Sequence, residues 1–152
     1  MGYVCDIKEM PAQPALAIRV RAKVEDLPKH FGEVYGKIFG YLGQIGEQPG
    51  GMPYAGYYNM DMQDLDVEIG VPTTRRLEGQ GDIQSVTLPG GKMATCRYTG
   101  SYANMEEAYN GLARYMQEQG LEPTGVSYEA YLNSPEEVPV DQLVTDIWFP
   151  VK

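Results

Sequence analysis

The chain has 152 residues, of which 43% are hydrophobic and 22% charged, a composition typical of a globular domain that can bury one core. Its net charge of −9 repels phosphate groups and attracts cationic ligands, so we expect no direct binding of nucleic acid. The same net charge also favours solubility of the protein. The sequence has no long apolar run and no basic, apolar leader, which predicts a cytoplasmic protein without membrane contact.

The first half predicts a β-α-β-β unit. After an additional strand at 2–9, the run ALAIRVRAKV has the character of a strand, and a helix is expected at about 27–45. Two further strands, 52–58 and 65–71, complete the unit. The apolar residues of the helix recur at helical spacing and form one stripe: Phe31, Val34, Tyr35, Ile38, Leu42 and Ile45.

The second half repeats this order after a connector at 73–82 and a short strand at 83–88. The run KMATCRYTG predicts a strand, and a helix is expected at about 104–119. Strands at 126–132 and 143–149 follow. The apolar stripe of this helix comprises Met105, Ala108, Tyr109, Leu112 and Met116.

The ends of both helices carry recognisable signals. Asn104 followed by Glu107 resembles a capping box at the start of the second helix. Gly46 and Gly120 are predicted to end the first and second helices, because glycine adopts the left-handed conformation at a helix C-terminus.

The two halves are related in sequence. Residues 35–59 align with 109–133 without a gap, and the matches include glycines and prolines that punctuate the chain. We therefore predict one domain, 1–152, with internal repeats at about 11–72 and 85–151. Its fold class is α+β: duplicated β-α-β-β units about a pseudo-twofold axis, an antiparallel sheet with two helices on one face, and a central ligand groove.

Candidate site residues come from a difference between the repeats. Alternation places Glu129 and Tyr131 on one face of their strand, and Asp146 and Trp148 on one face of the last strand. In the first half the positions of Glu129 and Trp148 hold Ala55 and Gly70. This asymmetry predicts one pocket, to which the second half supplies charge and bulk and the first half supplies space.

A carboxylate among aromatic rings suits a lipophilic cation, through charge attraction and cation–π contact. Plainer interpretations stay open: Glu129 as an exposed strand residue, Trp148 as core filling, and Asp146 as a solvated carboxylate. Cys5 and Cys96 are expected to be isolated, reduced, structural thiols. We expect neither a metal ion nor a cofactor, because no zinc cluster or catalytic triad is evident.

The duplicated unit, the stretch YEAYLNSPEEVP and the closing VTDIWFPVK resemble the GyrI-like, AraC-type effector-binding domains over roughly residues 3 to 151. These are ligand-sensing domains of multidrug-responsive bacterial transcription regulators. The resemblance implies a buried glutamate that meets cationic drugs at Glu129, with Asp146 and Trp148 on the closing strand. Tyr57, Tyr131 and Phe39 are implied to point toward the middle. The chain lacks room for a helix-turn-helix domain, so a stand-alone effector-binding protein is expected.

Three functions follow from this resemblance. The first is binding of a small-molecule ligand, with a preference for lipophilic or aromatic cations such as drugs. The second is hydrolysis of reactive cyclopropane-type compounds, with Glu129 as base or nucleophile and Tyr131 or Tyr57 orienting water. The third is an acidic inhibitor or interaction protein, whose partner is DNA gyrase or a regulator.

Overall fold

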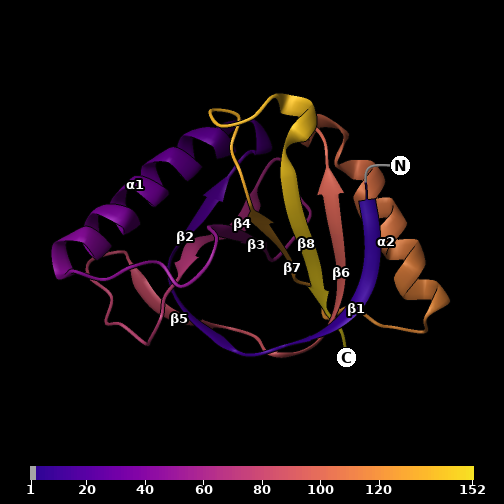
Figure 1. Cartoon of the computed structure of the whole chain (residues 1–152), viewed down its shortest axis with the longest axis horizontal. Coiled ribbons are helices and arrows are strands. Elements are labelled where there is room, and N and C mark those ends of the chain that lie inside the picture. Colours follow the sequence, from indigo (N-terminus) through magenta and orange to yellow (C-terminus); the bar gives the residue numbers. More distant parts are fainter. Residues whose placement is uncertain (1–2) are drawn as a thin grey trace. The chain divides into compact units, whose positions relative to one another are not determined.

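The computed structural model describes residues 3–152, and its chain divides into two compact units (Figure 1). The inserted unit is Ala12–Pro89. The terminal unit combines Gly90–Lys152 with the N-terminal strand. Each unit contains the same order of elements, strand, helix, strand, strand, and each has one further strand.

The inserted unit contains a fully antiparallel sheet with the strand order β3-β4-β2-β5. Its elements are β2 (Gln13–Ala22), the 3-10 turn η1 (Val24–Asp26), α1 (Leu27–Ile45), β3 (Tyr54–Tyr57), β4 (Leu65–Pro72) and β5 (Gln84–Leu88). The predicted repeat boundary at about 85 therefore runs through β5, which pairs with β2.

Helix α1 covers one face of this sheet. Its buried residues are Leu27, Val34, Ile38 and Leu42, which belong to the predicted apolar stripe except for Leu27. Ile45, at the end of the stripe, is instead 41% exposed. Gly46 has φ 73° and ends the helix, as predicted. The opposite face of the sheet carries Arg19, Arg21 and Asp66, which are at least partly exposed.

In the terminal unit the strands also pair antiparallel, in the order β1-β6-β8-β7. Its elements are β1 (Tyr3–Met10), β6 (Gly91–Thr99), the 3-10 turn η2 (Tyr102–Asn104), α2 (Glu106–Glu118), β7 (Ser127–Tyr131), the 3-10 turn η3 (Val140–Gln142) and β8 (Val144–Pro150). Gly2, the first residue of the predicted strand 2–9, lies outside the described residues.

Helix α2 packs on β6 and β8 through a buried apolar core. The core consists of Ala94, Cys96, Tyr98, Met105, Ala108, Leu112, Met116 and Ile147. Gly120 has φ 68° just beyond the helix, where the sequence predicts a stop. The predicted capping box is wrong, because Asn104 belongs to η2 and the N-cap, Met105, makes no side-chain capping bond.

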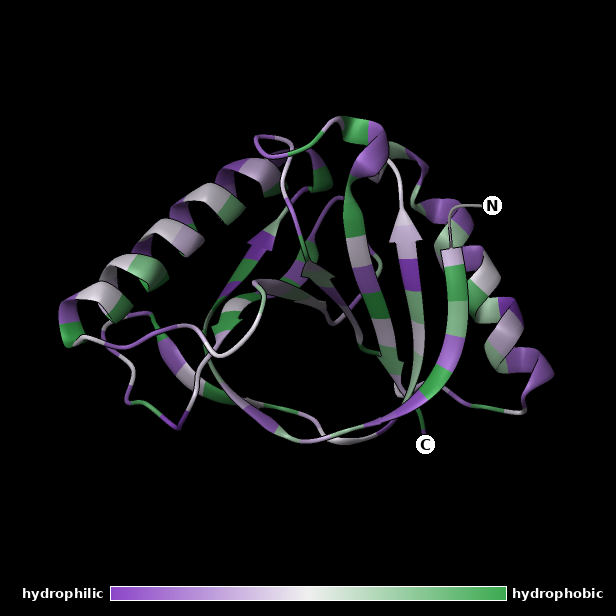
Figure 2. Ribbon diagram, viewed as in Figure 1, coloured by the Kyte–Doolittle hydropathy of each residue, from purple (hydrophilic) through white to green (hydrophobic). Residues whose placement is uncertain are grey.

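The α+β class, the antiparallel pairing and the two helices are confirmed, and strand ends differ from prediction by a few residues. The common order of elements fits a duplication, which remains a prediction. Within residues 3–152, no helix is long and apolar enough to cross a membrane. Figure 2 shows hydrophilic residues along both helices, consistent with one solvent-facing side each.

Candidate functional site

The site is centred on Glu129, a buried carboxylate in the terminal unit. Glu129 lies on β7 directly opposite Ile147 of β8, and Ile147 belongs to the core beneath α2. Glu129 therefore faces α2 and is only 9% exposed. From α2, the Tyr109 hydroxyl donates a hydrogen bond to Oε2 of Glu129. The Tyr131 hydroxyl donates to Oε1 at 2.8 Å.

Aromatic rings surround this carboxylate on several elements. Tyr102 of η2 meets Tyr131 edge-to-face, with ring centroids 6.1 Å apart. Tyr109 meets Phe149 of β8 in the same way, at 6.0 Å. We call these residues the Glu129 cluster: Glu129, Tyr102, Tyr109, Tyr131 and Phe149.

The electrostatics of the Glu129 cluster reflect burial. Burial raises the pKa of the Glu129 carboxyl, while the hydrogen bonds from Tyr109 and Tyr131 lower it to a smaller extent. Burial and the nearby Glu129 charge also raise the pKa of Tyr102. None of the ion pairs in the described part of the chain involves Glu129. The carboxylate is thus held by hydroxyl groups and not by a protein cation.

Asp146 and Trp148 lie on the other face of the same sheet. Trp148 is directly opposite Tyr128, and their rings stack with centroids 5.3 Å apart. Asp146 binds the guanidinium of Arg97 at 2.7 and 2.9 Å. The structure therefore does not bring Asp146 and Trp148 into one pocket with Glu129. The prediction that these three residues share a pocket is wrong. Alternation fixes the faces within each strand, but the register between β7 and β8 decides which faces coincide.

The space predicted at Gly70 is filled. A Cβ on Gly70 would lie 2.7 Å from the Leu16 carbonyl oxygen and 2.8 Å from the Tyr54 hydroxyl. Tyr54 is fully buried across from Gly70. The small residue thus admits a tyrosine of its own unit, so Gly70 does not leave room for a ligand as predicted.

Phe39 and Tyr57 belong to the inserted unit. Phe39 lies on α1, is 40% exposed, and has its ring 6.5 Å from that of Tyr35. Tyr57 lies on β3 opposite Val67, on the side of the sheet that α1 covers. Their role in ligand binding stays a prediction.

The inserted unit has a buried carboxylate of its own, which the sequence analysis did not single out. Glu68 on β4 is 8% exposed and accepts hydrogen bonds from the hydroxyls of Tyr54 at 2.6 Å and Tyr58 at 3.1 Å. Arg19 lies opposite Glu68 on β2 but binds Asp66 at 2.5 and 2.9 Å. Its guanidinium carbon sits 3.7 Å from the centroid of the Tyr58 ring. A protein cation therefore already covers this second tyrosine–carboxylate group.

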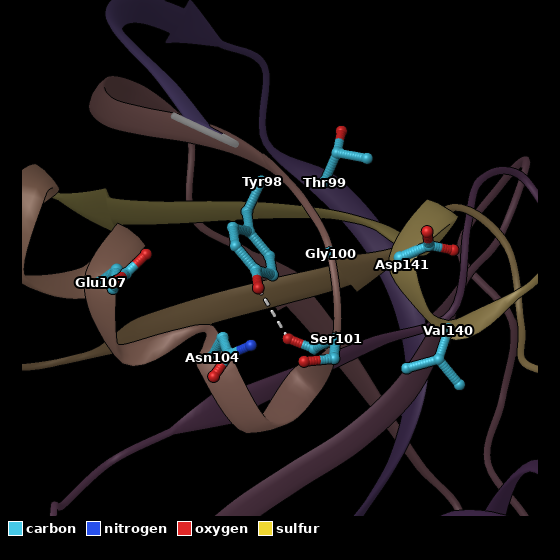
Figure 3. Close-up of a pocket in the computed structure, with 8 residues that line it drawn as sticks. All are labelled: Tyr98, Thr99, Gly100, Ser101, Asn104, Glu107, Val140 and Asp141. Atoms are coloured by element: carbon cyan, nitrogen blue, oxygen red, sulfur yellow. Dashed lines mark hydrogen bonds between the residues drawn. The ribbon is translucent and has the colours of Figure 1, made fainter.

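A surface hollow of about 550 Å³ lies elsewhere in the terminal unit (Figure 3). Its lining residues are Tyr98, Thr99, Gly100, Ser101, Asn104, Glu107, Val140 and Asp141. The Tyr98 hydroxyl donates to the Ser101 carbonyl oxygen at 2.8 Å. None of the predicted site residues lines this hollow. Among the described residues no group of His, Cys, Asp and Glu side chains is arranged to hold a metal ion.

Sequence reasoning missed Tyr102, Tyr109 and Phe149. Tyr109 was noticed as part of an apolar helical stripe, which is normally core. Its hydroxyl reaches Glu129 only because α2 packs on the face of the sheet toward which Glu129 points, a tertiary relation that no local pattern encodes.

One buried carboxylate among aromatic rings has the composition typical of a small-molecule site, which is mostly apolar with a few placed polar groups. The GyrI-like small molecule binding domain matches residues 4–152 of the chain. The chain therefore belongs to the GyrI-like family.

Solved structures with the same fold include the EcmrR–DNA complex, with a TM-score of 0.80 and 20% identity. The match covers 99% of this chain and 57% of EcmrR, so this chain spans little more than half of that regulator. The isolated EcmrR C-terminal domain has a TM-score of 0.76 and 20% identity, with 100% of this chain and 99% of that chain covered.

Two further structures share the fold at lower identity. A hydrolase from Listeria innocua has a TM-score of 0.72 and 14% identity, with 97% and 91% of the two chains covered. SAV2435 bound to tetraphenylphosphonium has a TM-score of 0.63 and 13% identity, with 98% and 94% covered. At such identities the likeness concerns the fold alone. The comparison with curated protein sequences found no match.

Proposed function

We propose that this chain binds lipophilic or aromatic cations, such as cationic drugs, at the Glu129 cluster. The observation that carries the proposal is a buried carboxylate that, within residues 3–152, accepts hydrogen bonds from two tyrosine hydroxyls, takes part in none of the ion pairs and lies among aromatic rings. Tyr131, predicted from sequence, is one of the two hydroxyl donors.

The physical reason is that an ionised carboxylate is costly to bury without an opposite charge. Hydroxyl donors reduce this cost but leave the negative charge in place. A bulky cation with apolar substituents would neutralise the charge of the carboxylate. Its apolar groups would displace water from the aromatic rings, and the faces of the rings would attract the cation through cation–π contact. Tetraphenylphosphonium bound to SAV2435 is a ligand of this chemistry on the same fold, and the net charge of −9 would favour its approach.

The test compares two ligands of nearly equal shape. Methyltriphenylphosphonium carries a positive charge, whereas triphenylphosphine oxide replaces the methyl group by oxygen and is neutral. Calorimetric titration at pH 8 should show at least tenfold tighter binding of the cation, about 1.4 kcal/mol. Equal affinities for both would refute the preference for cations, and binding of neither would refute the ligand class.

Hydrolysis is the second candidate. The raised pKa of Glu129 suits a general base or nucleophile, and the Tyr131 hydroxyl, 2.8 Å from Oε1 of Glu129, would orient a water beside it. The fold is also that of a Listeria innocua hydrolase. Turnover of a reactive cyclopropane compound, lost in Glu129→Gln, would support this function. A rate no higher than that in buffer would count against it. Binding to DNA gyrase or to a regulator remains a prediction from sequence.

A further inference from the structure

Cys5 and Cys96 are neighbours, although they are far apart in sequence. Cys5 on β1 lies directly opposite Cys96 on β6 in the antiparallel register. Both are free thiols, and each thiol contributes to the shifted pKa of the other. The sequence analysis predicted isolated, reduced, structural thiols, and the prediction that they are isolated is wrong.

This register meets the geometric requirement for a disulfide. Residues directly opposite in an antiparallel pair have Cα atoms about 4.5–5.5 Å apart, within the range of about 4.4–6.8 Å that disulfides span. Their side chains also leave the same face of the sheet. We propose that Cys5 and Cys96 form a redox-active dithiol, which a peroxide converts into a disulfide between β1 and β6.

The reaction balances with hydrogen peroxide as the oxidant. The Cys5 thiol releases its proton to solvent, and the resulting thiolate attacks one peroxide oxygen. The O–O bond breaks and the leaving hydroxide takes up a proton, so Cys5 sulfenic acid and water form. The Cys96 sulfur then attacks the Cys5 sulfur, the S–O bond breaks, and the disulfide and a second water form. The peroxide is reduced by two electrons, and the two thiols are oxidised by two.

The environment assigns the two roles. Cys5 is partly exposed, whereas Cys96 is 1% exposed and belongs to the core beneath α2. Cys5 is therefore the thiol that meets the oxidant, and Cys96 the one that resolves it. Burial raises the pKa of both, that of Cys96 to about 12, so little thiolate exists at neutral pH. The pair should respond to sustained oxidation and ignore brief exposure.

The topology gives the bond a consequence. The whole inserted unit, Ala12–Pro89, lies between the two cysteines in sequence, so the bond would close it into a covalent loop. In the terminal unit, β1 pairs with β6 alone. A crosslink to β6 would hold β1 in the sheet. A covalent loop of this length also strongly reduces the conformational entropy of the unfolded chain.

The experiment uses the full chain and Cys5→Ser, each treated with hydrogen peroxide at pH 8 and then denatured and alkylated with iodoacetamide. Intact mass and peptide mapping should show a Cys5–Cys96 crosslink in monomeric wild type, which dithiothreitol reverses. Alkylation of both thiols, over-oxidation without a crosslink, or only crosslinked dimers would overturn the proposal.

Thermal unfolding adds a second readout. The oxidised wild type should unfold at a Tm several degrees higher than the reduced protein, and the shift should vanish with dithiothreitol. Peroxide-treated Cys5→Ser should show no rise. A crosslinked wild type with an unchanged or lower Tm would refute the role of the bond in fixing β1.

Discussion

Replacing Glu129 by Gln is the sharpest test of the site. The substitution keeps the shape of the side chain and removes its charge. The Gln carbonyl can accept from one tyrosine, and the hydroxyl of the other can rotate to accept from the Gln amide. Because Tyr109 and Tyr131 both donate to the wild-type carboxylate, the variant can retain two hydrogen bonds, and the test isolates the charge.

The expected loss of affinity follows from Coulomb's law. A ligand cation about 5 Å from the carboxylate gains about 3 kcal/mol at an effective dielectric constant of about 20. Two costs offset part of this gain. The ligand loses its hydration, and at any pH at which the raised pKa keeps Glu129 protonated, the carboxyl must first release its proton. We expect Glu129→Gln to weaken methyltriphenylphosphonium binding tenfold to a hundredfold, about 1.4–2.8 kcal/mol.

The pH dependence has a definite sign. The raised pKa of Glu129 means that the folded protein holds a proton more tightly than the unfolded chain does. Glu129 thus contributes stability below the ordinary glutamate pKa of about 4.3, and this contribution is lost as the pH rises through the folded-state pKa. As the pH rises through the folded-state pKa, the cation affinity of the wild type should rise, whereas that of Glu129→Gln should stay constant. Over the same pH range, the variant should gain stability relative to the wild type.

The matched control is Glu68→Gln in the inserted unit, which alters another buried glutamate with two tyrosine donors. Calorimetry at pH 5 and pH 8 should show wild-type affinity for this control. If Glu129→Gln binds the cation as tightly as wild type at both pH values, Glu129 does not form the site. If both variants lose affinity equally, a general effect on folding is responsible.

Three further changes test separate parts of the structure. Tyr131→Phe removes a hydroxyl that lowers the pKa of the buried glutamate, so the pH midpoint of cation affinity should move upward; an unchanged midpoint would contradict the hydrogen bond. Gly70→Ala should destabilise the protein by about 1–3 kcal/mol in urea unfolding, because its Cβ would lie 2.7 Å from the Leu16 oxygen and 2.8 Å from the Tyr54 hydroxyl; wild-type stability would mean that Tyr54 moves freely. Asp146→Asn breaks a largely exposed ion pair, so it should cost less than about 1 kcal/mol and change cation affinity less than twofold; a tenfold loss would restore Asp146 to the site.

The elements of the fold were predictable because their signals are local. Apolar spacing at Val34, Ile38 and Leu42 locates α1, and Gly46 ends it in the left-handed conformation. The start of α2 was less predictable. Asn104 has the right residue type for a cap, but it lies inside the preceding 3-10 turn, and sequence spacing alone cannot distinguish these positions.

The site was only half predictable, because it depends on register and on helix placement. Alternation in YEAYLN correctly put Glu129 and Tyr131 on one face. It could not tell that Ile147, and not Trp148, stands across from Glu129. One residue of register reverses the face of every side chain on a strand. The Trp148 indole consequently packs on Tyr128, while Phe149 takes part in the Glu129 cluster.

The two units reach similar chemistry from positions that are not equivalent in the predicted repeat. Glu129 aligns with Ala55, whereas Glu68 aligns with Asp146. In the terminal unit, Arg97 binds Asp146 across the strands, so Glu129 is the carboxylate left to the tyrosines. In the inserted unit, the aligned Arg19 binds Asp66 instead, so Glu68 is left to Tyr54 and Tyr58. Each unit thus holds a carboxylate by an arginine and another by tyrosines, and the arginine that the described residues place over a tyrosine ring, Arg19 over Tyr58, stands at Glu68. That difference favours the Glu129 cluster as the place where a foreign cation binds.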